Sequence, residues 1–238
     1  MPRIAASKTS PKARTRKRLP VATFETAADL RAGAVALRRL CPVMRRVHDI
    51  VGDPPLRRYV PGFEGLARIV VGQQLSIASA AAIWKRAADA VTPFDAETFL
   101  AQDDATLRAA GLSQGKVRTL RAAAVAERDG ALTLGGPVPD DALREALMSV
   151  SGIGPWTADI YSLFCLGHAD GFAAGDLALQ IAVERAFELD TRPNAVALAE
   201  MAERWRPWRG VAAHLLWAFY AHAWSARSVA IRKRLKSV

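Results

Sequence analysis

Apolar positions recur at intervals of three and four residues from Glu25 onward, and alanine is abundant among them. No sustained alternation of apolar and polar residues appears, so the periodicity indicates helices rather than strands. The segments expected to be helical are 25–40, 62–72, 76–91, 103–110, 113–128, 140–149, 155–167, 176–188, 194–203 and 207–226. The sequence therefore predicts an all-α fold.

Residues that favour helix ends support several of these boundaries. Ser113, Asp140 and Asp141 stand where a side chain can cap a helix start. Three glycines fall at expected helix ends, namely Gly111, Gly130 and Gly167. The most apolar stretch, 211–226, contains two histidines and is shorter than the roughly 18 apolar residues of a membrane span, so we expect a buried helix and no membrane segment.

The net charge of +10 suggests a polyanionic partner, but its distribution changes that picture. Residues 1–18 carry seven Lys or Arg and no acid, residues 227–238 carry five and no acid, and the middle has a net charge of −2. We therefore expect a disordered basic arm at 1–23, a folded domain at 24–226 and a basic tail at 227–238. The arm also has the composition of a transit peptide, and both ends could serve solubility alone.

The two cysteines, Cys41 and Cys165, form no CxxC pair and lie in apolar surroundings. They predict neither a disulfide framework nor a cysteine-ligated zinc site, and two cysteines cannot hold a four-cysteine iron–sulfur cluster. We expect both to be reduced core residues.

The segment 147–159 carries the strongest local signal. A helix leads into Ser151-Gly152-Ile153-Gly154, and a second helix resumes at Pro155, where a first-turn proline is favoured. The two glycines permit positive φ angles and leave backbone N–H groups uncovered, while Thr157 lies near the new helix start. Such a turn can hold one DNA phosphate without any lysine, although it could also be an ordinary helical corner.

Three blocks together resemble the DNA-3-methyladenine glycosylase II family, within the helix-hairpin-helix base-excision DNA glycosylases. They are Val71–Ser76, the hairpin with Trp156–Ala158, and Trp205–Arg209 followed by His214–Trp217. The resemblance implies two helical subdomains with the active site in the cleft between them, and a monomer that acts on double-stranded DNA in the cytoplasm, or in the nucleus of a eukaryote. Some members carry an extra N-terminal α/β domain, and about sixty preceding residues indicate the compact version.

The resemblance also implies a catalytic aspartate some twenty residues after the hairpin. Asp176 lies 19 residues after Thr157 and becomes the candidate, although alone it would be interpreted as a helix cap. A carboxylate there would stabilise the cationic sugar left when an alkylated purine departs. Asp159 is expected to be a solvated or capping acid and Asp170 a structural one. Relatives often have a proline before the aspartate, whereas this chain has Ala173-Ala174-Gly175.

Aromatic residues at family pocket positions predict a site for the flipped base. Trp156 and Trp217 match such positions, Tyr161 is expected close by, and Ile160 replaces the family's other tyrosine. Trp84, Trp205 and Trp224 are expected in the core, and Trp208 is left open. Members that also cleave the strand resemble this motif with a lysine at the position of Trp156, and Lys85 lies in another segment. We therefore predict hydrolysis without β-lyase activity.

The resemblance places the residue that fills the gap in the duplex in Gln73-Gln74-Leu75, with Gln74 at the intercalating position. Gln73 and Gln74 could instead cap the preceding helix. Lys116 could contact a phosphate. The family also tends to bind an alkali ion, Na⁺ or K⁺, through hairpin carbonyls, which match Met148, Val150 and Ile153; no other cofactor is expected.

Three other functions remain open at this point. The same fold could act on a different lesion, such as an oxidised purine, although those enzymes are usually lyases. The hairpin could belong to a non-catalytic DNA-binding module. The chain could also be a helical scaffold whose tryptophans and glycines are all structural. The sequence does not rank 3-methyladenine, 7-methylguanine, hypoxanthine and ethenoadenine as substrates.

Overall fold

The computed structural model describes residues 23–135 and 140–236, with side chains of the last helix described up to residue 223. The predicted basic arm lies outside the described residues except for Thr23. The helices are α1 (Ala27–Leu40), α2 (Pro42–Val51), α3 (Phe63–Gly72), α4 (Ile77–Ala90), α5 (Ala96–Ala101), α6 (Asp104–Ala109), α7 (Gln114–Arg128), α8 (Asp140–Ser149), α9 (Pro155–Phe164), α10 (Leu177–Ala186), α11 (Ala195–Ala202), the 3-10 helix η1 (Glu203–Trp205) and α12 (Arg209–Lys236).

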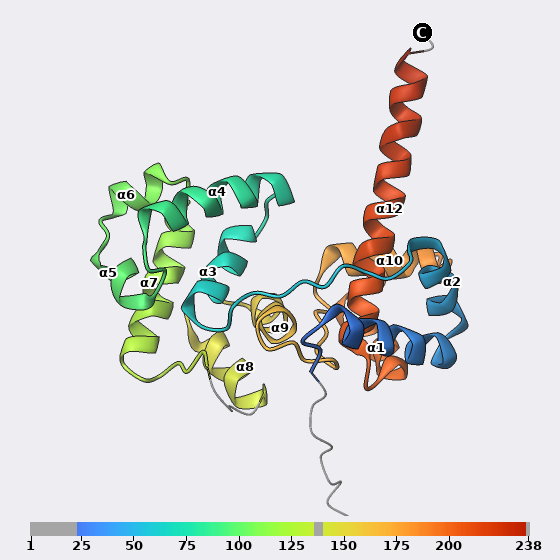
Figure 1. Cartoon of the computed structure of the whole chain (residues 1–238), viewed down its shortest axis with the longest axis horizontal. Helices are drawn as coiled ribbons and strands as arrows, with labels where there is room; N and C mark the ends of the chain where they lie inside the picture. The colour runs from blue at the N-terminus through green and yellow to red at the C-terminus, as the bar shows by residue number, and fades with distance from the viewer. Residues whose placement is uncertain (1–22, 136–139, 237–238) are drawn as a thin grey trace, which may run out of the picture.

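The described residues are helical apart from loops and one isolated β-bridge, so the all-α prediction is confirmed. The helices form two lobes, with α3 to α7 in one and α1, α2, α10 and α12 in the other (Figure 1). Helix α9 lies between the lobes and packs against α3, and an extended segment at 52–62 crosses from α2 to α3. This arrangement confirms two helical subdomains.

The predicted boundaries agree with most of the helices, and the exceptions have local causes. Ser113 accepts a hydrogen bond from the N–H of Lys116, and the three predicted end glycines all have positive φ angles. Helices α2 and α5 were not predicted, because α2 buries only two of its ten residues and α5 has only six residues. The predicted end of the last helix at 226 was wrong, since α12 continues to Lys236 through part of the predicted tail.

The hydrophobic core confirms several predictions for single residues. Both cysteines are buried and free, and Trp205 is fully buried. Trp208 packs over α1, where a Cβ on Gly33 would lie 3.0 Å from its ring. The side chain of Trp224 lies outside the described part. No helix among the described residues combines the length and apolar character needed to cross a membrane.

His214, on α12, is a titratable group inside this core. It is 2% exposed, its Nδ1–H donates to the carbonyl of Gly210 at 2.8 Å, and its Nε2 has no partner. The ring packs edge-on against Phe24 and Trp217. Burial lowers the pKa of His214 from 6.5 to about 4, so the ring is neutral at pH 7.

This histidine should make the protein acid-sensitive. The unfolded chain binds the proton more tightly, so the contribution of neutral His214 is complete above pH 6.5 and is lost as the pH falls toward 4. The loss from this one group should be up to about 3 kcal/mol of unfolding free energy. Denaturant titrations at several pH values, beside His214→Gln, would measure it. An equal pH dependence in both proteins would contradict this role.

Candidate active site

The predicted hairpin is present, and its two glycines have different structural roles. Gly152 has a φ of +88°, and a Cβ there would lie 1.9 Å from Oγ1 of Thr119 on α7. Gly154 has a φ of −100° and is the residue before α9, so only Gly152 adopts the positive φ that both glycines permit. A Cβ on Gly154 would meet nothing within 4 Å. Gly152 therefore permits the turn, and Gly154 leaves the start of α9 uncovered.

The segment between α3 and α4 is fixed by hydrogen bonds among three of the predicted DNA-binding residues. The amide of Gln73 donates to the hydroxyl of Thr157 at 2.8 Å, and Thr157 is 2% exposed. The ammonium of Lys116 donates to the carbonyls of Val71 and Gln73 at 2.7 and 3.1 Å, and burial lowers its pKa. The side chains of Gln73, Thr157 and Lys116 thus make hydrogen bonds within the protein. These bonds tie the segment between α3 and α4 to α7 and α9.

Gln74 and Leu75, by contrast, project outward from this fixed segment. Gln74 is exposed and has a φ of +57°, a conformation that costs energy for a residue with a side chain. Leu75 is 39% exposed, and Ile77 at the start of α4 is 81% exposed. The predicted wedge position therefore forms a protruding tip with apolar residues beside it.

Asp176 lies at the start of α10, and its carboxylate accepts hydrogen bonds from both predicted tryptophans. Its Oδ2 accepts from the indole N–H of Trp156 at 2.8 Å, and its Oδ1 accepts from the indole N–H of Trp217 at 3.1 Å. Oδ1 also accepts from the backbone N–H of Leu179 at 3.0 Å. Three N–H donors from three helices therefore fix the orientation of one carboxylate.

The loop before Asp176 has no proline, but hydrogen bonds hold it. The N–H of Asp176 donates to the carbonyl of Ala173 at 2.9 Å, and the amide of Gln180 donates to the carbonyl of Ala174 at 3.1 Å. These two hydrogen bonds hold the backbone of the loop before Asp176, although the family's proline is absent.

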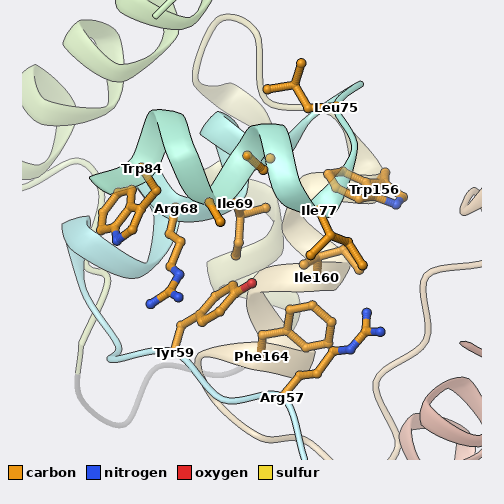
Figure 2. Close-up of a pocket in the computed structure, with 13 residues that line it drawn as sticks. Arg57, Tyr59, Arg68, Ile69, Leu75, Ile77, Trp84, Trp156, Ile160 and Phe164 are labelled. Carbon is orange, nitrogen blue, oxygen red and sulfur yellow. The ribbon is translucent and has the colours of Figure 1, made fainter. Parts of the chain in front are cut away.

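A cavity of about 290 Å³ is lined by Trp156, the indole that donates to Asp176, while Asp176 itself is not among the lining residues. Figure 2 shows Trp156 and Arg57 at one end of the cavity and Trp84 and Arg68 at the other. The lining residues are Arg57, Tyr59, Arg68, Ile69, Gly72, Leu75, Ile77, Ala80, Ala81, Trp84, Trp156, Ile160 and Phe164. Most are aromatic or aliphatic, which is typical of a pocket for a flat aromatic ligand.

This geometry agrees with the comparison to known families. The model of the HhH-GPD superfamily of base excision DNA repair proteins matches residues 67–207, which include the hairpin, Asp176 and the segment 73–75. The chain belongs to this superfamily.

Individual relatives of the superfamily are similar over parts of their length. A Mycobacterium tuberculosis protein named "Probable bifunctional transcriptional activator/DNA repair enzyme" is 33% identical over 46% of this chain, which spans 21% of that relative. The DNA-3-methyladenine glycosylase 2 of Escherichia coli is 28% identical over 69% of this chain and 59% of its own. The solved 3-methyladenine DNA glycosylase of Schizosaccharomyces pombe, in complex with abasic DNA, is 26% identical with a TM-score of 0.71, over 78% of this chain and 95% of its own.

Two aromatic residues predicted for the base pocket of this HhH-GPD protein do not line the cavity. Tyr161 is fully buried, where its hydroxyl donates to the carbonyl of Leu134 and accepts from the N–H of Gly62, so the pocket prediction was wrong for it. Trp217 is 6% exposed and serves the site through Asp176 instead. Trp84, expected in the core, is only half-buried and lines the cavity.

The residues that sequence reasoning missed come from outside the motifs. Arg57 and Tyr59 belong to the extended segment between the lobes, and Arg68 lies on α3. The guanidinium of Arg57 lies 5.5 Å from the ring centre of Trp217, and that of Arg68 lies 4.6 Å from the ring centre of Tyr59. The sequence feature that could have indicated these residues is the Arg57-Arg58-Tyr59 run shortly after two prolines. Prolines stiffen the segment that carries these cations and the aromatic ring.

The competing aspartates are both in ion pairs away from the cavity. Asp159 on α9 pairs with Arg144 on α8 at 3.1 Å and is mostly buried, so the expectation of a solvated or capping acid was wrong. Burial raises the pKa of Asp159. Asp170 pairs with Arg206 and with Arg209, the latter at 3.0 Å, and is structural as predicted. Asp176 is thus the carboxylate that faces the tryptophans of the cleft.

The predicted alkali-ion ligands lie at the end of α8 and in the turn. Met148 is in the last turn of α8, where carbonyls lack helical partners, and the carbonyl of Val150 accepts the N–H of Ile153 at 3.0 Å. A carbonyl oxygen has a second lone pair, so these positions fit an ion, and the site stays a prediction. The described residues contain no cluster of His, Cys, Asp and Glu able to hold a metal.

Proposed function

We propose that the protein is a monofunctional DNA glycosylase that flips alkylated purines, of the 3-methyladenine and 7-methylguanine type, out of double-stranded DNA. The observation that carries this proposal is the Asp176 carboxylate, held by the indoles of Trp156 and Trp217 beside an aromatic cavity. The superfamily supports it, and so does the name of the Schizosaccharomyces pombe neighbour, solved with abasic DNA.

In this proposal the duplex lies across the cleft. The open start of α9 after Gly154 binds a phosphate through backbone N–H groups, and Gln74 and Leu75 fill the space of the flipped nucleotide. An Na⁺ or K⁺ ion on the carbonyls of Met148, Val150 and Ile153 would fix the turn. The protein would act as a monomer in the cytoplasm, or in the nucleus of a eukaryote.

The chemistry follows from where the carboxylate lies. The base enters the cavity along the face of Trp156, and the sugar remains near Asp176. When the bond between C1′ and the base nitrogen breaks, its electron pair goes to the cationic base, which leaves neutral. The carboxylate stabilises the positive charge on the sugar. Water then adds to C1′ and releases a proton, which gives an abasic site.

The lysines of the described residues support hydrolysis without strand cleavage. Lys85 and Lys116 are the lysines whose side chains the structure describes, and neither lines the cavity. Lys85 pairs with Asp89 at 3.0 Å, and Lys116 is bonded to carbonyls. A Schiff base with the sugar needs an amine at the reacting carbon, and Trp156 cannot supply one.

Methylated duplex DNA tests this proposal. Incubation with the purified protein should release methylpurine, detected by chromatography, and the DNA should break only after heating in alkali. Tight binding without base release would favour a DNA clamp instead. Breaks without alkali would show a lyase nucleophile.

Trp156 should contribute through its N–H as well as through its face. Trp156→Phe keeps an aromatic ring in the cavity but removes the donor to Asp176. Loss of one hydrogen bond to a charged group should lower the rate of base release by about 10- to 100-fold, with little change in the affinity for DNA. Single-turnover kinetics and DNA titrations would separate the two effects. An unchanged rate would mean that the indole N–H does not orient the carboxylate.

A further inference from the structure

A groove on the lobe of α3 to α7, apart from the cavity beside Trp156, is both acidic and apolar. It has a volume of about 560 Å³ and lies where α3 begins, against the start of α5 and the end of α7. Its charged lining residues are Glu64, Asp95, Glu97, Glu127 and Arg128, and the others are apolar. We call it the acidic groove. It shares no residue with the hairpin turn or with the segment 73–75.

The negative charge of the acidic groove is not balanced within the described residues. The side chains of Glu64 and Glu97 make no hydrogen bond or ion pair there. Oε2 of Glu127 is buried without a partner, and burial raises the pKa of Glu127. Arg128, the cation among the lining residues, pairs instead with Asp129 at 2.9 Å. The groove therefore favours a cationic occupant, which would stabilise the charged form of its carboxylates.

The described chain begins close to the acidic groove. The N–H of Phe24 donates to the carbonyl of Gly167 at 2.8 Å, beside the loop that follows α9 (Figure 1). Glu25 pairs with Arg58 at 3.2 Å. Arg58 is two residues before Val60, which lines the groove and is 63% exposed. The basic arm therefore joins the described structure within a few residues of the groove.

The basic arm has the charge and the length to occupy this groove. Residues 1–18 carry seven Lys or Arg and no acid, and residues 19–21 are apolar. An extended chain covers about 3.3 Å per residue, so residues 19–21 suffice for the step from Arg58 to Val60. The cations at 16–18 then reach the acids of the groove. Charges that meet against apolar surface are screened less by salt than charges in open water.

We propose that the basic arm binds in the acidic groove of its own chain while no DNA is bound, with the cations of residues 16–18 beside Glu64 and Glu97. Duplex DNA is a polyanion and competes for the same cations. Binding of DNA by the arm then requires its release from the groove, so the groove weakens binding to undamaged duplex. This inference goes beyond the proposed glycosylase function, and no step of it involves a damaged base.

Carbodiimide cross-linking of the full chain tests the docking in the absence of DNA. The reagent joins a lysine amine to a carboxylate in contact with it. The lysines of the arm are Lys8, Lys12 and Lys17. Mass spectrometry should find the main cross-links between these lysines and Glu64 or Glu97, and about 0.5 M salt should abolish them. Even cross-linking over exposed acids, including Asp190 and Glu200 beyond α10, would overturn the inference. So would arm cross-links confined to pairs of chains, which would assign the groove to a second copy.

The affinity for undamaged duplex tests the competition with DNA. Glu64→Gln combined with Glu97→Gln should tighten binding about 10-fold at low salt, the gain expected when the competent state rises from about a tenth of the population to nearly all of it. Asp190→Asn combined with Glu200→Gln removes the same charge from exposed positions outside the groove and should gain much less. Equal gains would overturn the inference, because they would reflect net charge alone.

The outcomes separate this inference from the proposed function. Neither measurement uses a lesion, so a protein that releases no methylpurine would overturn the proposed function and leave the docked arm to be judged by its cross-links. Thermal melting of each double variant shows whether a change in affinity reflects a change in folding. If the groove variant is destabilised, Glu97→Gln alone replaces it, since Glu97 is exposed in the first turn of α5.

Discussion

Asp176→Asn should lower the rate of base release by at least about 10²-fold, the scale of losing one preorganised electrostatic contact to the transition state. The neutral amide cannot stabilise the positive sugar. Asparagine is as good a helix cap as aspartate, so the bond to the N–H of Leu179 should persist and the fold should remain. The rate is measured with excess protein over methylated duplex, and binding is measured separately.

Asp103→Asn is the matched control for this variant. Asp103 caps α6 through the N–H of Thr106, is exposed, and does not line the cavity. The substitution removes the same charge from the same kind of position. If Asp176→Asn releases base as fast as Asp103→Asn does, the carboxylate is a helix cap and another group performs the chemistry.

Gly152→Ala should lower the unfolding free energy by about 2–4 kcal/mol, because it combines a left-handed φ with a steric clash. The new methyl group would lie 1.9 Å from Oγ1 of Thr119, which packs α7 against the hairpin turn. Adding Thr119→Ala should recover part of the loss, since it removes the closest atom but leaves the unfavourable φ. Denaturant unfolding of the single and double variants measures both contributions.

Gly154→Ala is the comparison within the same turn. Its backbone is extended, and an added Cβ meets nothing within 4 Å, so the stability should hardly change. The methyl group would instead cover the start of α9, so the affinity for duplex DNA should fall. Equal destabilisation by Gly152→Ala and Gly154→Ala would contradict the structure of the turn.

The sequence predicted the parts of the site that depend on local spacing. The hairpin turn and the N-terminal position of Asp176 are set by residues within one or two helices. The family resemblance, not spacing, assigned Trp156, Asp176 and Trp217 to one site, and the hydrogen bonds that join them were not predicted. Helix periodicity likewise placed α7 to within one residue, because it carries a buried stripe and a capping serine.

The rest of the site depends on packing between the lobes, which spacing does not determine. Arg57 comes from an extended segment without periodicity, so its destination follows only from where the two lobes meet. Ile160 and Tyr161 are neighbours on α9, and their side chains point about 100° apart. Ile160 therefore lines the cavity, whereas Tyr161 lies in the core. Asp159 on α9 forms an ion pair with Arg144 on α8, and neither residue's position in the sequence predicts this contact between two helices.

The charge on the sugar gives the most direct test of the account. A duplex with a pyrrolidine abasic analogue carries a positive charge close to C1′, and a tetrahydrofuran analogue has the same shape without the charge. The account predicts that the protein binds the charged duplex more tightly, as expected for a transition-state mimic, and that Asp176→Asn abolishes the difference. Equal affinity for the two duplexes, or a preference that survives Asp176→Asn, would contradict it.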